Sequence, residues 1–369
     1  MKSREAEILR SVVQTLREDD VKNNSAFLGF DACIDNIVRV VSGKKEEETR
    51  FFQTSRQFAE YIVTRGDKSC GIELSTTISK PGGNMVITAN ALGTLGVQTD
   101  CAGTFGLPEI LPFFRTMSSN CSLVTIGDTI TATALEFENN KVILFDPGPY
   151  NILTWESIVK IIGKENLIGL IKDKALVSFL NWSEIEQSSR IWEGFLNDII
   201  PQSVPENSGK IFFTDFSDCS RRSAGEIFHV TELLKRFRKH FRVILSLNQN
   251  EADIVATAMG IKLSGDRDER LIESLFKVCG TDILVIHRNE DALGFDGKNI
   301  SSSSNIMCDK PAVLTGGGDN FNAGFCLAQL KGFDILGSLA VANGVAGYYV
   351  RNGASPTLEQ LINFLTMNL

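Results

Sequence analysis

The sequence contains few of the residues that build metal centres or thiol chemistry. Its three histidines lie far apart, and they form no Ser–His–Asp arrangement that spacing alone can support. Its eight cysteines stand singly, with no C-x-x-C pair and no histidine at ligand spacing beside them. These absences argue against a zinc site and a disulfide framework. We therefore expect buried free thiols in a reducing compartment, the cytoplasm.

Long apolar runs and an excess of positive charge are also missing. No run of about 18 apolar residues occurs, and the first 20 residues form an amphipathic, charged pattern without the apolar core of a signal peptide. We expect no membrane partner and no export. The net charge of -8 argues against binding to nucleic acid, because a phosphate backbone attracts excess cations. The basic stretch 235–242 (KRFRKHFR) lies where a helical pattern ends, which is a favourable place for cations.

What the sequence does contain is a regular alternation of short β-branched runs with longer helical patterns. This alternation predicts βαβ units, and hence an α/β fold with three α/β/α layers around a mainly parallel central sheet. The length of 369 residues fits one large domain with an appendage, or two domains. The predicted core strands are 26–30, 97–102, 175–180, 210–214, 241–247 and 283–287.

Two segments depart from this alternation. Parts of 34–80 contain a strand-like IVRVV, a helical pattern and a threonine-rich stretch, and 129–146 reads as two alternating strands joined by a turn at 138–140. Together they predict a small β-sheet that stands apart from the main one and acts as a lid. We expect residues 1–369 to form one domain that carries this lid.

The segment 314–327 (LTGGGDNFNAGFCL) contains three glycines, an aspartate and the start of a helix. Backbone N–H groups of Gly316, Gly317 and Gly318 can converge on an anion, and the helix N-terminus adds favourable partial charge. Asp319 can take the proton from an alcohol that attacks a phosphate. The alternative is that Asp319 only caps the helix.

The order of this motif and three others resembles the ribokinase-like, or PfkB-type, carbohydrate kinase family. The other three are GFDACIDNIVRV at 29–40, PGGNMVITANALGTLGV at 81–97 and NQNE at 248–251. The resemblance implies a ribokinase-like kinase, with a sugar and a nucleotide as its small-molecule substrates. It covers most of the chain.

Residues expected to bind the sugar lie in the first two of these motifs. The resemblance assigns adjacent sugar hydroxyls to Asp35, whose alternative role is in a turn at the end of a strand. Asp31 lies two strand periods earlier, and either faces the same pocket or caps the loop. Gly82 and Gly83 allow close approach of a ligand, or merely form a tight turn. Asn84 either donates to a hydroxyl or caps the helix.

Residues expected near the nucleotide lie later in the chain. Glu251 is assigned to Mg²⁺ through ordered water, with Asn248 in support. The spacing of these two residues fits a capping box equally well. Thr315 is expected to contact the nucleotide, and Asn343 to border its base, although helix packing alone explains the small residues around Asn343.

The sequence departs from the family pattern in three places. HRNEDALGF at 287–295, expected to form the glycine-containing loop after the last core strand, lacks a T-x-G-type phosphate contact. Ile87 stands where relatives often carry asparagine. The long segment 42–79 is reminiscent of ADP-dependent sugar kinases, but FFTDFS at 212–217 lacks the H-x-E motif expected of that branch. ATP is therefore the favoured donor, with ADP as the alternative.

These observations predict a carbohydrate kinase. The enzyme is expected to transfer the terminal phosphate of ATP to a primary hydroxyl of a sugar or sugar derivative, with Asp319 as general base and Mg²⁺ as cofactor. The alternatives are a silent sugar- or nucleotide-binding regulator, a nucleoside or vitamin-precursor kinase, and an ADP-dependent sugar kinase. Exposed sheet edges invite pairing, so the lid could form a homodimer contact, but the charged stretch 43–48 (GKKEEE) could equally block it.

Overall fold

The structure is a computed structural model that describes residues 2–18, 24–45, 48–138, 140–262, 267–313 and 315–369. Two β-sheets organise these described residues. Leu314, at the start of the glycine-rich motif, and Asn139, in the turn expected at 138–140, lie outside them.

The large sheet has the strand order β14-β13-β12-β11-β10-β9-β1-β5-β6. Neighbours from β6 to β12 pair in parallel, and the last two pairings, β12 with β13 and β13 with β14, are antiparallel. The fold class is therefore confirmed, and each of the six predicted core strands is found. The strands are β1 (Ser25–Phe30), β5 (Gln98–Gly103), β6 (Cys121–Thr125), β9 (Leu176–Phe179), β10 (Ile211–Asp215), β11 (Arg242–Asn248), β12 (Ile283–His287), β13 (Asp291–Phe295) and β14 (Ile300–Ser304).

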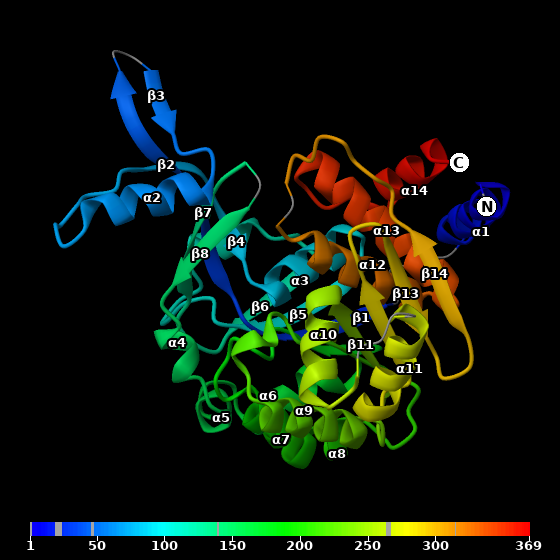
Figure 1. Cartoon of the computed structure of the whole chain (residues 1–369). Coiled ribbons are helices and arrows are strands. Elements are labelled where there is room, and N and C mark those ends of the chain that lie inside the picture. Colours follow the sequence, from blue (N-terminus) through cyan, green and yellow to red (C-terminus); the bar gives the residue numbers. More distant parts are fainter. Residues whose placement is uncertain (1, 19–23, 46–47, 139, 263–266, 314) are drawn as a thin grey trace.

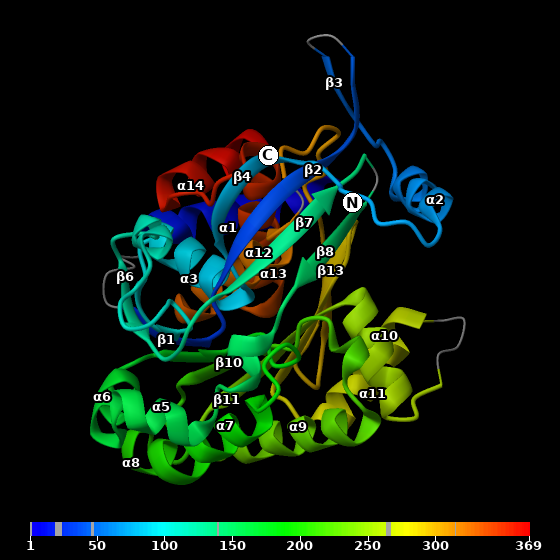
Figure 2. The same ribbon diagram turned by 90° about the vertical axis from the view of Figure 1, so that its left-hand side faces the viewer.

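Helices cover both faces of the large sheet and make the three layers visible in Figures 1 and 2. Buried side chains of each face form one apolar cluster with the helices packed on it. One face carries α5 (Trp155–Ile162), α6 (Lys164–Lys172), α7 (Ser188–Gly194), α8 (Ile200–Ser203), α9 (Ala224–Phe237), α10 (Gln249–Ala258) and α11 (Arg267–Cys279). The other carries α1 (Lys2–Glu18), α3 (Asn84–Thr94), α12 (Gly317–Leu330), α13 (Ile335–Asn352) and α14 (Leu358–Met367).

The basic stretch 235–242 ends a helix, as its sequence predicts. Helix α9 stops at Phe237, which is fully buried. The cations around it pair with carboxylates on neighbouring elements, Arg238 with Asp282 at 2.7 Å and Lys239 with Glu206 at 2.7 Å. This stretch is therefore a neutralised helix end rather than a patch open to a phosphate backbone.

The small sheet stands apart from the large one, as expected from 34–80 and 129–146. Its central strand β2 pairs antiparallel with β4, parallel with β7 and, at its far end, with β3, while β8 pairs with β7. Figure 1 shows β2, β3 and α2 projecting from the body. The elements are β2 (Cys33–Lys45), β3 (Glu48–Phe51), α2 (Ser55–Arg65), β4 (Leu74–Gly82), β7 (Ile130–Glu136), β8 (Lys141–Phe145) and the short helix α4 (Gly148–Asn151).

Candidate active site

Polar residues gather where the parallel strands of the large sheet end. Asp31 follows β1, Asn181 follows β9, and Asp215, Asn248 and His287 are the last residues of β10, β11 and β12. Because these strands are parallel, their carboxyl ends meet at one edge, which is where open α/β sheets bind ligands. The site is therefore assembled from segments far apart in the sequence.

Asp31 is fully buried and lies at the N-terminus of α3, whose capping residue is Gly83. Its carboxylate accepts hydrogen bonds from the backbone N–H groups of Asn84 at 2.8 Å and Met85 at 2.9 Å, and from the amide of Asn181 at 2.8 Å. Burial raises the pKa of Asp31 to about 6, against these hydrogen bonds. Asp31 lies in the loop before β2, so the expectation that it shares a strand face with Asp35 is wrong. Its role as a sugar ligand stays a prediction.

The two glycines at 82–83 lie against the two carboxylates. A Cβ at Gly82 would come within 2.3 Å of the Asp35 carboxyl carbon, and one at Gly83 would come within 2.6 Å of an Asp31 oxygen. Gly83 also has a φ of +99°, which disfavours any side chain. Close approach of the backbone to Asp35 and Asp31, beyond a simple tight turn, therefore requires glycine at both positions.

Asp35 lies on β2, half-buried, and faces the site from the small sheet. Burial raises the pKa of Asp35, while the Cys33 thiol, which donates to it at 3.3 Å, and the charges of Lys80 and Lys141 act in the opposite direction. A carboxylate held between a thiol and two cations keeps lone pairs for polyol hydroxyls. This environment suits the predicted role of Asp35.

Asp319 lies in the first turn of α12, directly after the glycine-rich turn. Gly316, with a φ of +92°, is the residue that caps this helix, so the alternative that Asp319 is the cap is wrong. The side chain of Asn84 bonds to Asp319, and since Gly83 is the cap of α3, Asn84 does not cap its own helix. Burial and the nearby charges of other carboxylates, Asp215 foremost, raise the pKa of Asp319 well above its usual range. A carboxyl group with a raised pKa is a better proton acceptor.

Glu251 and Asn248 form the capping box that their spacing allows. The Asn248 side chain accepts from the Glu251 N–H at 2.9 Å, and Glu251 accepts from the Asn248 N–H at 2.9 Å. Glu251 is buried, and burial together with the charge of Asp215 raises its pKa. Asp215 is also buried and accepts from the amide of Asn322 at 2.7 Å and from the N–H of Ser217 at 2.7 Å. The cap is thus real, and it holds Glu251 beside a second carboxylate.

These two carboxylates fit a hydrated Mg²⁺ ion. The side-chain amide oxygen of Asn322, on α12 next to Asp215, and the hydroxyl of Ser246, on β11, are buried without a hydrogen-bond partner. In the part of the chain that the structure describes, no three acidic, histidine or cysteine side chains lie close enough to hold a metal directly. Mg²⁺ bound through water and phosphate oxygens needs no such cluster.

A cavity of about 1100 Å³ opens beside the glycine-rich turn. Gly317, Gly318, Asn248, His287 and Asn343 are among the residues that line it. The amide of Asn343 donates to the carbonyls of residues 303 and 304 at 3.0 and 3.1 Å, so it fixes β14 against α13 as well. The cavity has room for a nucleotide next to the predicted phosphate-binding turn.

Near this cavity, Thr315 departs from its expected contact with the nucleotide, whereas the sequence predicts no role for His287. Thr315 does not line it: its hydroxyl accepts a hydrogen bond from Lys141 of the small sheet, and its carbonyl accepts from Tyr349 at 2.9 Å. His287 occupies the end of β12 where the T-x-G contact is missing. Its ring packs on Phe321 with 5.0 Å between centroids, and burial lowers the pKa of His287 to about 4.

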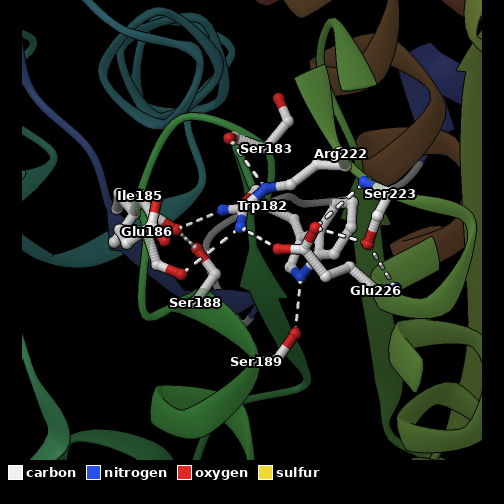
Figure 3. A network of polar contacts seen from close by, with 9 residues as sticks. All are labelled: Trp182, Ser183, Ile185, Glu186, Ser188, Ser189, Arg222, Ser223 and Glu226. Carbon is white, nitrogen blue, oxygen red and sulfur yellow. Dashed lines mark hydrogen bonds and ion pairs between the residues drawn. The ribbon is translucent and has the colours of Figure 1, made fainter. Parts of the chain in front are cut away.

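The loops after β9 and β10 are tied together by Arg222 (Figure 3). Its guanidinium donates to the carbonyls of Ile185 at 2.6 Å, Ser183 at 3.1 Å and Trp182 at 3.2 Å, and it pairs with Glu226 at 2.8 Å. These loops follow the strand ends that carry Asn181 and Asp215. Arg222 therefore stabilises the backbone from which both site residues project.

Sequence reasoning missed several residues of this site. Asp215 ends a buried strand in FFTDFS, and an acidic residue at the end of a core strand was a usable signal. Asn181 has a left-handed backbone conformation, with a φ of +55°, which no local pattern indicates. Lys80, Lys141 and Tyr349 meet only through tertiary structure, so nothing in their own sequence neighbourhoods marks them.

Comparisons with known proteins agree with this geometry. A model of the prokaryotic ketohexokinase family matches residues 4–367. The chain belongs to this family. Family members are sugar kinases, phosphotransferases with an alcohol group as acceptor, and this membership speaks against a silent regulator. A ketohexokinase from Haloferax volcanii is 27% identical over 349 residues, which span 93% of this chain and 91% of that protein.

Solved structures of ribokinase-like kinases share the fold of this prokaryotic ketohexokinase family member. A ribokinase from Arabidopsis thaliana complexed with ribose and ATP has a TM-score of 0.66 at 16% identity, covering 93% of this chain and 98% of that one. An adenosine kinase from Sinorhizobium meliloti has a TM-score of 0.64 at 14% identity, covering 94% and 100%. At such low identity these matches show the fold alone.

Proposed function

We propose that the protein is an ATP-dependent ketohexokinase. It transfers the terminal phosphate of ATP to a primary hydroxyl of a ketohexose, with Asp319 as the general base. The observation that carries this proposal is the position of Asp319 in the first turn of α12, where it directly follows Gly317 and Gly318, which line the cavity, and where the charge of Asp35 acts on it. The family match and the Haloferax volcanii relative support the ketohexose as acceptor.

In this reaction the sugar binds at Asp35 with its primary hydroxyl toward Asp319. Asp319 takes the hydroxyl proton as the oxygen attacks the terminal phosphorus, and the N–H groups of Gly316, Gly317 and Gly318 stabilise the phosphoryl oxygens. The raised pKa of Asp319 favours this proton transfer. Closure of the small sheet over the site excludes water, so transfer to the sugar is favoured over hydrolysis.

ATP and Mg²⁺ are the proposed donor and cofactor. The two appear together in a solved ribokinase-like structure from E. coli. When bound, Mg²⁺ would neutralise charge on the phosphates, and here Glu251 and Asp215 would hold its water shell. Asn248 would orient Glu251, and Asn343 would border the base. Thr315, whose hydroxyl accepts a hydrogen bond from Lys141 of the small sheet, would affect nucleotide binding indirectly, by holding the start of the glycine-rich turn.

Replacement of the proposed base tests the mechanism. Asp319→Asn is expected to lower kcat roughly 10²- to 10⁴-fold, because asparagine cannot accept the proton. Sugar binding, measured by calorimetry without nucleotide, is expected to persist. Asp173→Asn is the matched control, because Asp173 lies just before β9. It is therefore at the amino ends of the parallel strands, away from the carboxyl ends that form the site. Full turnover by Asp319→Asn would reject the assignment.

Substrate panels separate the remaining alternatives. The enzyme is given Mg-ATP with ketohexoses, aldohexoses, pentoses, sugar phosphates, nucleosides and vitamin precursors, and ADP formation is followed. We expect the highest kcat/KM with a ketohexose. A nucleoside or vitamin precursor as the best acceptor would place the protein elsewhere in the superfamily. Repeating the panel with ADP as donor tests the ADP-dependent alternative.

We also propose one kinase domain over residues 1–369, located in the cytoplasm, with the small sheet as its lid and dimer contact. Five of the eight cysteines are buried, which fits small apolar residues in a reducing compartment, whereas Cys70 is exposed, contrary to expectation. The described residues contain no helix long and apolar enough to span a membrane. β8 forms an edge of the small sheet and exposes Val142, Ile143 and Leu144, which supports pairing with a second copy.

A further inference from the structure

Two lysines of the small sheet reach the glycine-rich turn of the body. Lys141, the first residue of β8, donates a hydrogen bond from Nζ to Oγ1 of Thr315, the residue before Gly316. Nζ of Lys80, on β4, lies 3.3 Å from the hydroxyl of Tyr349, which in turn donates to the carbonyl of Thr315 at 2.9 Å. Both contacts join the lid to the segment that precedes the phosphate-binding glycines.

The ammonium group of Lys141 lies within the electric field of the site carboxylates. Burial is the largest influence on the pKa of Lys141 and lowers it, while the charges of Asp35 and Asp319 raise it and that of Lys80 lowers it. The proposed sugar ligand and the proposed base therefore both act on this one cation.

The reaction needs positive charge at this place. A phosphoryl group in transfer carries negative charge on three oxygens, and stabilisation of that charge is the main task of such sites. The glycine-rich turn offers N–H dipoles, but Asp319 follows it directly, and the negative charges of Asp35 and Asp215 act on Asp319. When bound, Mg²⁺ would supply positive charge to the phosphates, and a lysine of the lid would supply it from the small sheet.

We propose that Lys141 is a further catalytic residue, whose ammonium group contacts the phosphoryl group as it passes from ATP to the sugar, and that Thr315 holds it there when the lid is closed. This inference rests on the proposed function. The bond between the sugar oxygen and the terminal phosphorus forms, and the bond from that phosphorus to the bridging oxygen breaks. The hydroxyl proton goes to Asp319, ADP leaves, and Lys141 keeps its proton throughout.

Because the lid carries Lys141, its closure would also favour transfer of the phosphate to the sugar over hydrolysis of ATP. With the lid open, the body alone provides the N–H groups of the turn without the lysine. The site is then complete only after a sugar has allowed the lid to close, so ATP hydrolysis in the absence of sugar is suppressed. We expect the sugar-independent ATPase rate to be low in the wild type.

Substitution of Lys141 tests the proposal. Lys141→Ala is expected to lower kcat roughly 10²- to 10³-fold, the loss typical of removing one group that stabilises transition-state charge. The Kd for the sugar without nucleotide should stay unchanged, Lys141→Arg should retain part of the activity, and methylammonium should partly restore Lys141→Ala. Lys44→Ala is the control, because Lys44 lies on the same lid in an exposed ion pair with Glu73 at 2.6 Å.

The outcomes separate the possible roles of this lysine. A Lys141→Ala enzyme with unchanged kcat but raised KM and Kd for the sugar would make Lys141 a sugar ligand and overturn the proposal. Unchanged kcat and KM would overturn it as well. Thermal melting of each variant establishes that losses do not come from unfolding. An inactive wild type would overturn the proposed function itself, whereas an active wild type beside an active Lys141→Ala would overturn only the role of Lys141.

Discussion

At the scale of single residues, Glu251 combines two roles that one substitution can separate. Glutamine at the same place can still close a capping box with Asn248, but it carries no charge for a metal-bound water. We expect Glu251→Gln to fold normally and to need at least about tenfold more Mg²⁺ for half-maximal activity, the loss typical of outer-shell changes. Mg²⁺ titration of the initial rate measures this shift.

The same variant has a predictable pH dependence of stability. Burial and Asp215 raise the pKa of Glu251 in the folded state, so the folded protein binds more protons than the unfolded one above the usual value of 4.5. The contribution of Glu251 to the free energy of unfolding therefore falls as pH rises from about 4.5 through the folded pKa. Without Mg²⁺, Glu251→Gln should melt above the wild type at pH 8 and lose this advantage toward pH 4.5.

Glu226 provides a matched control for this experiment. It occupies the same third position of a capping box, with Ser223 at the start of α9, but it lies on the Arg222 network (Figure 3). Glu226→Gln should leave the Mg²⁺ requirement unchanged. An equal Mg²⁺ requirement in Glu251→Gln and the wild type would show that Glu251 only caps α10.

Residues of the site were predictable where local sequence and family resemblance coincide. Asp319 and the glycines before it can be predicted from the local sequence, because the turn and the start of the helix lie in one short segment. Asp31 shows the limit: its type and position were found, but its hydrogen bonds to α3 come from a segment more than 50 residues away. Lys141 and Tyr349 carry no local signal, since their meeting at Thr315 depends on how the lid packs on the body.

At the scale of elements, the glycine-rich turn depends on the backbone of Gly316. Its φ of +92° is costly for any other residue, and a Cβ would approach the Tyr349 hydroxyl to 2.8 Å. We expect Gly316→Ala to cost more than the roughly 1–2 kcal/mol of left-handed strain alone, and to lower kcat by displacing the turn. Urea unfolding and initial rates measure the two effects.

Gly209→Ala isolates the contribution of strain. Gly209 has a φ of +73°, and a Cβ there would meet no atom within 4 Å. This control should lose stability by about the strain alone, roughly 1–2 kcal/mol, with an unchanged kcat. If both variants lost the same stability and kept full activity, the close packing of Gly316 on Tyr349 would be irrelevant to the site.

Elements were predictable in proportion to how locally their patterns are determined. The core strands are short runs of apolar, often β-branched residues. They could be predicted because strands that are buried on both faces contain few polar residues. The stretch 287–295 was treated as a loop, yet its second half is β13, which pairs antiparallel with β12 through the turn. The alternation of apolar and polar residues in this stretch is short, and charged residues interrupt it. The strand therefore becomes evident only from its pairing with β12.

At the scale of the whole molecule, the fold was predictable because the βα alternation leaves few topologies, and right-handed crossovers reduce them further. The position of the small sheet was not, since it depends on pairing of β2 with β7 across more than 90 residues. That sheet now joins three proposed tasks: it carries Asp35, it brings Lys141 to the turn, and it presents a free edge. Its assembly with a second copy is therefore the property to test at this scale.

Ile143 lies at the centre of β8 with 46% of its surface exposed, and Ile152, outside the sheet, is 75% exposed. If β8 pairs with a second copy, Ile143→Glu places a charge in a buried apolar contact and should convert a dimer to a monomer. Light scattering coupled to gel filtration measures the mass. Ile152→Glu should leave the mass unchanged, because it replaces an equally apolar surface residue that is not part of β8. A monomeric wild type, or a dimer that survives Ile143→Glu, would show that copies do not associate through β8. A monomer with full activity would show that the lid of each chain closes over the site of the same chain.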